Sequence, residues 1–175
     1  MEPVEVRYAD CPTLAVDIVI DAPPEAVWQF VSDIQLPARF SSEFDGAEWL
    51  DGTGPAAGAR FIGRNRHPAI GEWETTSTIS EYEPGSVFGW AVGELDNPSS
   101  RWRFTLAAEG DGTRLTQWMQ MGPAPSGINL AIAAMPDKES KILHRRLGEH
   151  RRNMESTLAG IKQLAEDASA RQGRP

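Results

Sequence analysis

The chain has 175 residues, of which 40% are hydrophobic and 24% charged, and its formal net charge at pH 7 is −8. This length and composition are typical of one soluble globular domain that buries about 70% of its unfolded surface. The negative charge repels phosphate backbones, so we expect no nucleic-acid partner. No apolar run approaches the roughly 20 residues that span a bilayer, so we expect no membrane insertion.

The single cysteine, Cys11, excludes an internal disulfide, and residues 1–5 lack the basic and apolar pattern of a signal peptide. Both observations favour a cytoplasmic protein. The pattern along the chain predicts an N-terminal arm over residues 1–12, one domain over 13–168 and a frayed tail over 169–175.

Alternating apolar positions predict a first strand, and these positions are Leu14, Val16, Ile18 and Ile20. Pro23 and Pro24 end this strand and begin a helix, because proline removes a ladder donor but suits the first turn of a helix. One face of that helix carries Val27, Phe30, Val31 and Ile34. The four-residue spacing of Leu36, Phe40 and Phe44 predicts a second short helix.

Turn-forming clusters rich in Gly, Pro, Asn and Asp divide the middle of the chain. They separate six predicted strands, over residues 47–50, 60–66, 73–82, 87–92, 102–107 and 113–121. The connections are too short for crossover helices, so we expect an antiparallel meander.

A long amphipathic helix is predicted from Pro136 to about Ala168. Its apolar arc contains Leu143, Leu147, Met154, Leu158, Ile161 and Ala165. The predicted fold is therefore α+β, with a curved seven-stranded antiparallel sheet gripping this helix and two short helices between the first and second strands.

Four stretches carry a resemblance to a known superfamily, and they are residues 20–28 with 31–33, 58–66, 83–84 and 112–116. Over roughly residues 13–165 the chain resembles the START-like, or Bet v 1-like, superfamily with its helix-grip fold. Within it, the chain is similar to the polyketide cyclase/dehydrase and lipid-transport group. The resemblance implies a hollow between sheet and helix that holds an apolar molecule. No motif of a characterised cyclase matches, so no catalytic residue is carried over.

Strand alternation predicts which side chains face that hollow and contact a ligand. They are Phe61, Asn65, Trp73, Thr75, Ser77, Trp90, Trp102, Gln117 and Met119. Tryptophan and methionine offer broad, adaptable apolar contact, whereas the amides and hydroxyls can orient a bound molecule. The alternative is that these residues fill a solid core and satisfy one another.

His150 lies within the apolar arc of the long helix, so it should point at the sheet. An imidazole there can contact a ligand, or serve as the acid or base of a cyclisation or dehydration. No carboxylate at a recognisable offset marks an orienting partner. We therefore prefer a ligand contact to a catalytic role.

The stretch 122–135 is rich in glycine and proline, yet it contains Ile128, Leu130, Ile132 and Met135. These residues are too apolar for an ordinary exposed connection. We interpret the segment as a lid over the mouth of the hollow, or alternatively as a surface buried in a homodimer or against the long helix.

No phosphate-binding loop or dinucleotide fingerprint occurs, and the three histidines lack metal-ligand spacing, so we expect neither cofactor nor metal. The leading prediction is a protein that binds a small hydrophobic or amphipathic molecule in an internal cavity. One alternative is a polyketide cyclase/dehydrase that uses the same cavity. The other is a regulatory or interaction protein whose cavity is mostly filled.

Overall fold

The computed structural model describes residues 5–50, 52 and 54–173. Its single sheet is antiparallel throughout and has the strand order β1-β7-β6-β5-β4-β3-β2. The strands are β1 (Thr13–Ile20), β2 (Phe44–Trp49), β3 (Arg60–His67), β4 (Gly71–Glu83), β5 (Val87–Gly93), β6 (Pro98–Glu109) and β7 (Gly112–Met121). The helices are η1 (Tyr8–Asp10), α1 (Pro24–Val31), η2 (Leu36–Arg39), α2 (Ile128–Ala134), η3 (Pro136–Lys138) and α3 (Glu139–Gln172).

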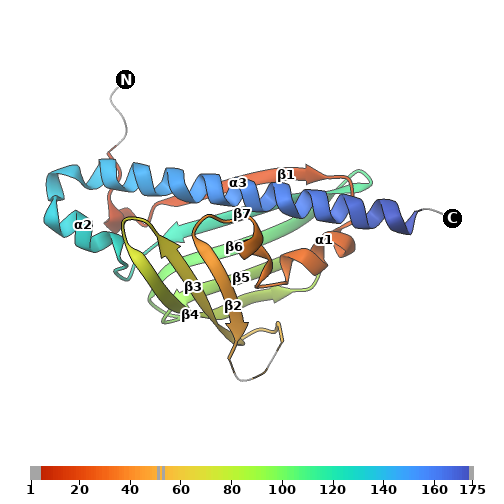
Figure 1. The fold of residues 1–175 in the computed structure, drawn as a ribbon, viewed down its shortest axis with the longest axis horizontal. Coiled ribbons are helices and arrows are strands. Elements are labelled where there is room, and N and C mark those ends of the chain that lie inside the picture. Colours follow the sequence, from red (N-terminus) through yellow and green to blue (C-terminus); the bar gives the residue numbers. More distant parts are fainter. Residues whose placement is uncertain (1–4, 51, 53, 174–175) are drawn as a thin grey trace.

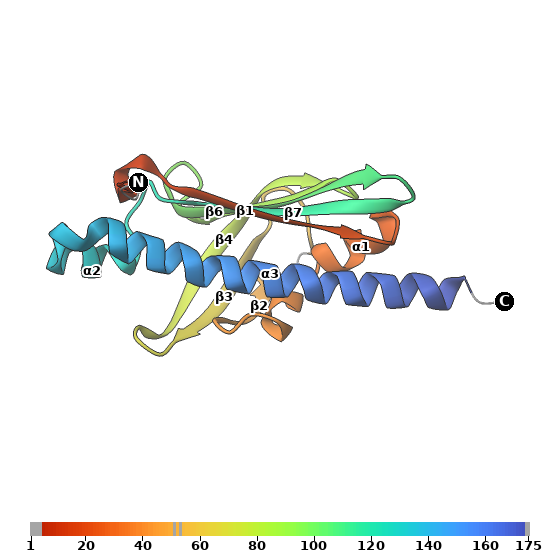
Figure 2. The same ribbon diagram turned by 90° about the horizontal axis from the view of Figure 1, so that it is seen from above.

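Helix α3 runs along the whole molecule across one face of the sheet (Figure 1). Seen from above, β1, β6 and β7 lie on one side of α3, and the tip of the β3–β4 hairpin emerges on the other (Figure 2). The buried positions of α3 include Leu143, Met154, Leu158, Ile161 and Ala165, as the helical spacing predicts. The predicted helix-grip architecture is therefore confirmed.

The junction between β1 and α1 also follows the sequence. Leu14, Val16 and Ile20 are buried in β1, and α1 begins at Pro24 with Val27 and Val31 buried. Because the two prolines fix where the strand stops and the helix starts, the alternating face and the helical face both turn toward the core.

The second short helix differs from its prediction. It is a single 3₁₀ turn, η2, and Phe44 does not lie on its face but begins β2. The side chain of Ser41 accepts hydrogen bonds from the backbone N–H groups of Glu43 (3.1 Å) and Phe44 (2.9 Å). A serine that bonds to backbone in this way competes with helix continuation, which the four-residue spacing of aromatic residues did not reveal.

The N-terminal end of the described chain packs on the domain, whereas residues 170–173 at the C-terminal end are exposed. Tyr8 is buried, its N–H donates to Glu139 Oε1 (2.8 Å), and its hydroxyl donates to the carbonyl of Ala124 (2.6 Å). Helix α3 continues through Gln172, beyond its predicted end at Ala168. Residues 1–4 of the predicted arm and 174–175 of the predicted tail lie outside the described residues. Within the described part of the chain, no helix combines the length and apolar character needed to cross a bilayer.

Candidate functional site

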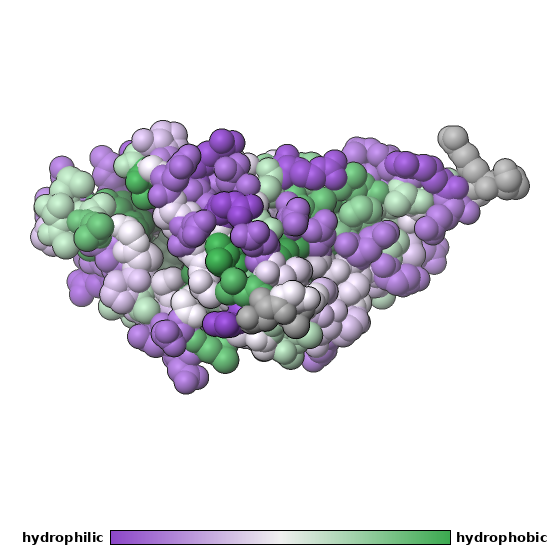
Figure 3. Space-filling view, turned by 60° about the horizontal axis from the view of Figure 1, so that its bottom comes forward, coloured by the Kyte–Doolittle hydropathy of each residue, from purple (hydrophilic) through white to green (hydrophobic). Residues whose placement is uncertain are grey.

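A cavity of about 580 Å³ lies between the concave face of the sheet and α3. Strands β3 to β7 supply one wall, α3 supplies the opposite wall, and α2 borders one end. The cavity is partly open to solvent. In the space-filling view, the surface is hollowed next to the hydrophobic residues of α2 (Figure 3).

All ten residues predicted to contact a ligand line this cavity. They are Phe61, Asn65, Trp73, Thr75, Ser77, Trp90, Trp102, Gln117, Met119 and His150. Residues directly opposite in an antiparallel ladder share a face, and the register pairs Trp90 with Trp102 and Trp102 with Met119. Strand alternation therefore brings the expected side chains together, whereas their contact with a ligand stays a prediction.

Stacked indoles form the centre of the sheet wall. The rings of Trp90 and Trp102 lie 6.2 Å apart between centroids and only 7° from parallel. Trp102 Nε1–H donates to Ser100 Oγ (3.0 Å), and its ring meets that of His150 edge to face at 5.3 Å. An indole whose polar atom is already bonded presents apolar surface to the cavity.

One buried polar atom of the cavity wall lacks a partner. Gln117 is 6% exposed, and its Oε1 has no hydrogen-bond partner among the described residues. An unsatisfied buried acceptor costs about 1–3 kcal/mol, which a hydroxyl or N–H donor of a bound molecule would offset. The site therefore combines apolar walls with a polar group that can orient a ligand.

His150 projects from α3 toward the sheet, as predicted. Burial, together with the nearby positive charge of Arg146, lowers the pKa of His150 to about 3. Among the residues that the structure describes, neither ring nitrogen has a hydrogen-bond partner. A neutral imidazole with so low a pKa is a weak proton acceptor near pH 7, so its surroundings suit a ligand contact better than a general base.

This pKa has a consequence for stability. The unfolded chain takes up the His150 proton as the pH falls through about 6.5, whereas the folded chain stays neutral down to about 3, so stability falls with pH across that window. Between pH 7 and pH 4.5 the wild type should lose about 2.5 kcal/mol more stability than His150→Gln. Urea unfolding at both pH values measures this, with exposed His144→Gln as control. Equal losses in the wild type and His150→Gln would contradict the assignment.

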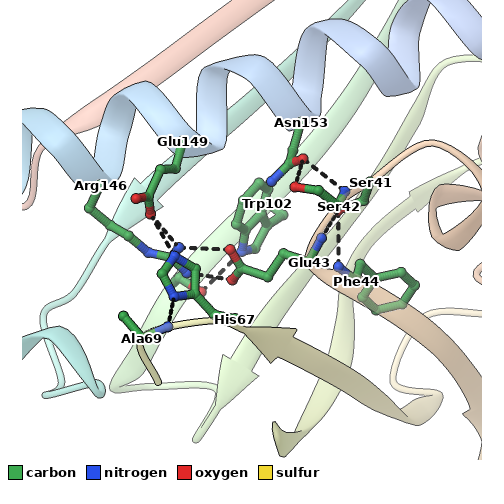
Figure 4. Close-up of polar contacts among 11 residues, drawn as sticks. Ser41, Ser42, Glu43, Phe44, His67, Ala69, Trp102, Arg146, Glu149 and Asn153 are labelled. Carbon is green, nitrogen blue, oxygen red and sulfur yellow. Dashed lines mark hydrogen bonds and ion pairs between the residues drawn. The ribbon is translucent and has the colours of Figure 1, made fainter. Parts of the chain in front are cut away.

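A network of ion pairs borders the cavity near Trp102 (Figure 4). Arg146 of α3 donates two hydrogen bonds to the carboxylate of Glu43, one of them at 2.7 Å, and a third to Glu149 at 3.0 Å. His67 Nε2 lies 3.3 Å from Glu149. Burial alone would lower the pKa of Arg146, but the two carboxylates outweigh it and raise the pKa overall. The network therefore ties α3 to the start of β2 and to the β3–β4 hairpin.

The sequence reasoning missed Arg146 and Glu43 as cavity-lining residues. Arg146 comes three residues after Leu143 and four before His150, so helical spacing places it at the border of the apolar face. This spacing could have indicated that Arg146 lies beside the cavity. Glu43 lies 103 positions away in the chain, and no local pattern indicates it.

Only some of the four residues predicted to form a lid lie at the cavity. Ile128 lines the cavity and Ile132 packs against the core, whereas Leu130 is 79% and Met135 40% exposed. The difference is geometric, since Leu130 lies about 200° around the helix from Ile128. Whether α2 moves over the opening stays a prediction.

Within the described residues, no cluster of His, Cys, Asp or Glu is arranged to hold a metal ion.

The fold and its internal cavity define a START-like, or Bet v 1-like, helix-grip protein. The chain belongs to the polyketide cyclase/dehydrase and lipid transport family, whose profile matches residues 12–166. Comparison with curated protein sequences finds no significant match.

Solved structures show the same fold. The polyketide cyclase-like protein Cgl2372 of Corynebacterium glutamicum is 28% identical, with a TM-score of 0.65 over 93% of this chain and 96% of that one. The ZhuI aromatase/cyclase of Streptomyces sp. R1128 is 16% identical, with a TM-score of 0.65 over 94% and 99% of the two chains. The protein TTHA0849 of Thermus thermophilus is 18% identical, with a TM-score of 0.61 over 90% and 99%. At the identity of the last two, the likeness is one of fold.

Proposed function

We propose that the protein binds one small hydrophobic or amphipathic molecule in the cavity between the sheet and α3. The observation that carries the proposal is the cavity itself. It has about 580 Å³ of space, walls of stacked indoles, and a buried amide oxygen of Gln117 without a partner among the described residues. Sites for small molecules generally have this size and this mixture of apolar walls with a few polar groups.

The expected affinity follows from the area that a ligand would bury. About 300 Å² of apolar ligand surface at about 25 cal/mol per Å² contributes roughly 7 kcal/mol before the costs of association. A hydroxyl or N–H group that bonds to Gln117 would add to this and fix the orientation. A contribution of about 7 kcal/mol alone corresponds to a Kd of about 10 μM, so the costs of association place the expected Kd between about 10 μM and about 1 mM.

A polyketide cyclase/dehydrase activity is the second candidate, and the family membership together with the position of His150 in the cavity wall favours it. The low pKa of His150 and the lack of an orienting carboxylate among the described residues weigh against proton transfer by this side chain. A protein with a mostly filled cavity fits less well, because of the volume that remains between sheet and helix.

Isothermal titration with 1-dodecanol, an uncharged probe with one hydroxyl, tests the binding proposal. We expect one molecule per chain and a Kd between about 10 μM and about 1 mM. His150→Gln should retain this binding, whereas under the cyclase alternative it should abolish turnover of a polyketide substrate. No heat and no displacement of a fluorescent apolar probe by 1-dodecanol would count against binding.

A further inference from the structure

A second, smaller pocket adjoins the aromatic cavity. It has a volume of about 270 Å³ and lies between α3 and the region of β2 and the β3–β4 hairpin. Glu43 and Asn153 line both spaces, so the two share a wall. The two spaces differ in chemistry, because polar side chains line most of the second pocket, whereas the first has a mainly apolar lining that includes the stacked indoles.

The acceptor groups of the second pocket are already used. Glu43 accepts two hydrogen bonds from Arg146, and Glu149 is held by Arg146 and His67 (Figure 4). His67 Nδ1 accepts from the N–H of Ala69 (3.1 Å), so its proton lies on Nε2, facing Glu149. The carboxylates and the imidazole of this pocket are therefore satisfied within the protein.

The acceptor atom of the Asn153 amide also has its hydrogen-bond partners within the protein. Its Oδ1 accepts both the N–H (3.0 Å) and the hydroxyl (2.9 Å) of Ser42. This leaves the Nδ2 group, which can only donate, without a partner among the described residues.

The pocket also contains two cations that are weakly engaged. Arg152 is exposed and has no ion pair or hydrogen bond within the described chain. Arg66 lies 3.7 Å from Asp45, and both side chains of that pair are more than half exposed. A pair so exposed contributes little and can exchange its partner. The side chains of this pocket that lack a strong partner within the described chain are thus Arg66, Arg152 and the amide N–H of Asn153, all of which donate, and two of them carry positive charge.

We propose that the second pocket binds the anionic head group, a carboxylate or phosphate, of an amphipathic ligand whose apolar body occupies the aromatic cavity. This inference rests on the proposed function and specifies its ligand class. An acceptor-rich anion complements two guanidinium groups and an amide N–H, and charge-assisted hydrogen bonds of this kind are the stronger ones. Glu43 and Asn153 border both spaces, so the head group and the apolar body of one ligand would lie next to these two residues.

The test compares dodecanoate with 1-dodecanol at pH 8, where the carboxylate is ionised. In the double variant Arg66→Gln/Arg152→Gln we expect dodecanoate to bind about tenfold more weakly and 1-dodecanol to change less than twofold. Arg151→Gln serves as the matched control, because Arg151 is an exposed neighbour on α3 that pairs with Glu155 and lies outside both pockets. The preference for dodecanoate should also weaken at high salt.

Three results would overturn the inference, and they are distinguishable. If both probes bind the wild type and the double variant leaves dodecanoate unaffected, the head-group site is wrong while the cavity proposal stands. If neither probe binds the wild type, the proposed function fails and the inference fails with it. If inorganic phosphate alone binds as tightly as dodecanoate and depends on the same two arginines, the second pocket is an independent anion site.

Discussion

Replacing Thr75 by Trp is expected to weaken the binding of 1-dodecanol about 100-fold. Thr75 lines the cavity from β4 and lies opposite Gly63 of β3, so a larger side chain there extends into the cavity. Each methylene group that the indole excludes costs about 0.8 kcal/mol, and losing three or four of these contacts corresponds to about 100-fold in Kd.

The matched control is Thr76→Trp, because Thr76 is the next residue of β4 and is exposed on the opposite face of the sheet. This variant should bind 1-dodecanol as the wild type does. Isothermal titration of both variants, with thermal melting to verify folding, measures the difference. Equal affinities for the two variants would show that the ligand does not occupy this cavity.

The ion network predicts a large loss of stability in Arg146→Met. The side chains of Arg146 and Glu43 are 13% and 11% exposed, so removing the guanidinium leaves a largely buried carboxylate without its partner. The expected cost is about 3–5 kcal/mol in the free energy of unfolding. The double variant Glu43→Gln/Arg146→Met should recover most of this loss, because the buried charge is then removed as well.

Chemical unfolding of the two single variants and the double variant measures this coupling as a double-mutant cycle. Arg151→Met is the control, since its pair with Glu155 is about half exposed and contributes little. Additive effects of Glu43→Gln and Arg146→Met would mean that the pair does not stabilise the fold as a unit.

Most of the fold could be predicted from the sequence, because its local patterns all indicate the same helices and strands. The apolar alternation that ends at Ile20, the prolines that follow it and the helical spacing from Val27 all predict the same junction, and the structure has it. The same alternation placed Trp90 and Trp102 on the concave face. Successive side chains of a strand alternate between the two faces of the sheet. Once one residue is assigned to the concave face, the faces of the other residues in that strand follow.

Two features could not be predicted from local sequence patterns. One depends on two side chains that are distant in sequence, and the other depends on a single polar side chain. The pairing of Arg146 with Glu43 joins α3 to the start of β2, and no local period encodes it. The hydrogen bonds of Ser41 end η2 before Phe44 can join its face. The volume left between sheet and helix was likewise inaccessible from the sequence alone, because it depends on how far α3 stands from the concave face.

The central claim is that a small apolar molecule binds between the stacked indoles and α3, and NMR of the indole N–H groups tests it most directly. On titration with 1-dodecanol, the signals of Trp90 and Trp102 should shift to saturation at one equivalent. The signal of Trp118, whose ring packs under the guanidinium of Arg103 and does not line the cavity, should stay in place. Unchanged signals from Trp90 and Trp102, or a shift of Trp118 alone, would contradict the account.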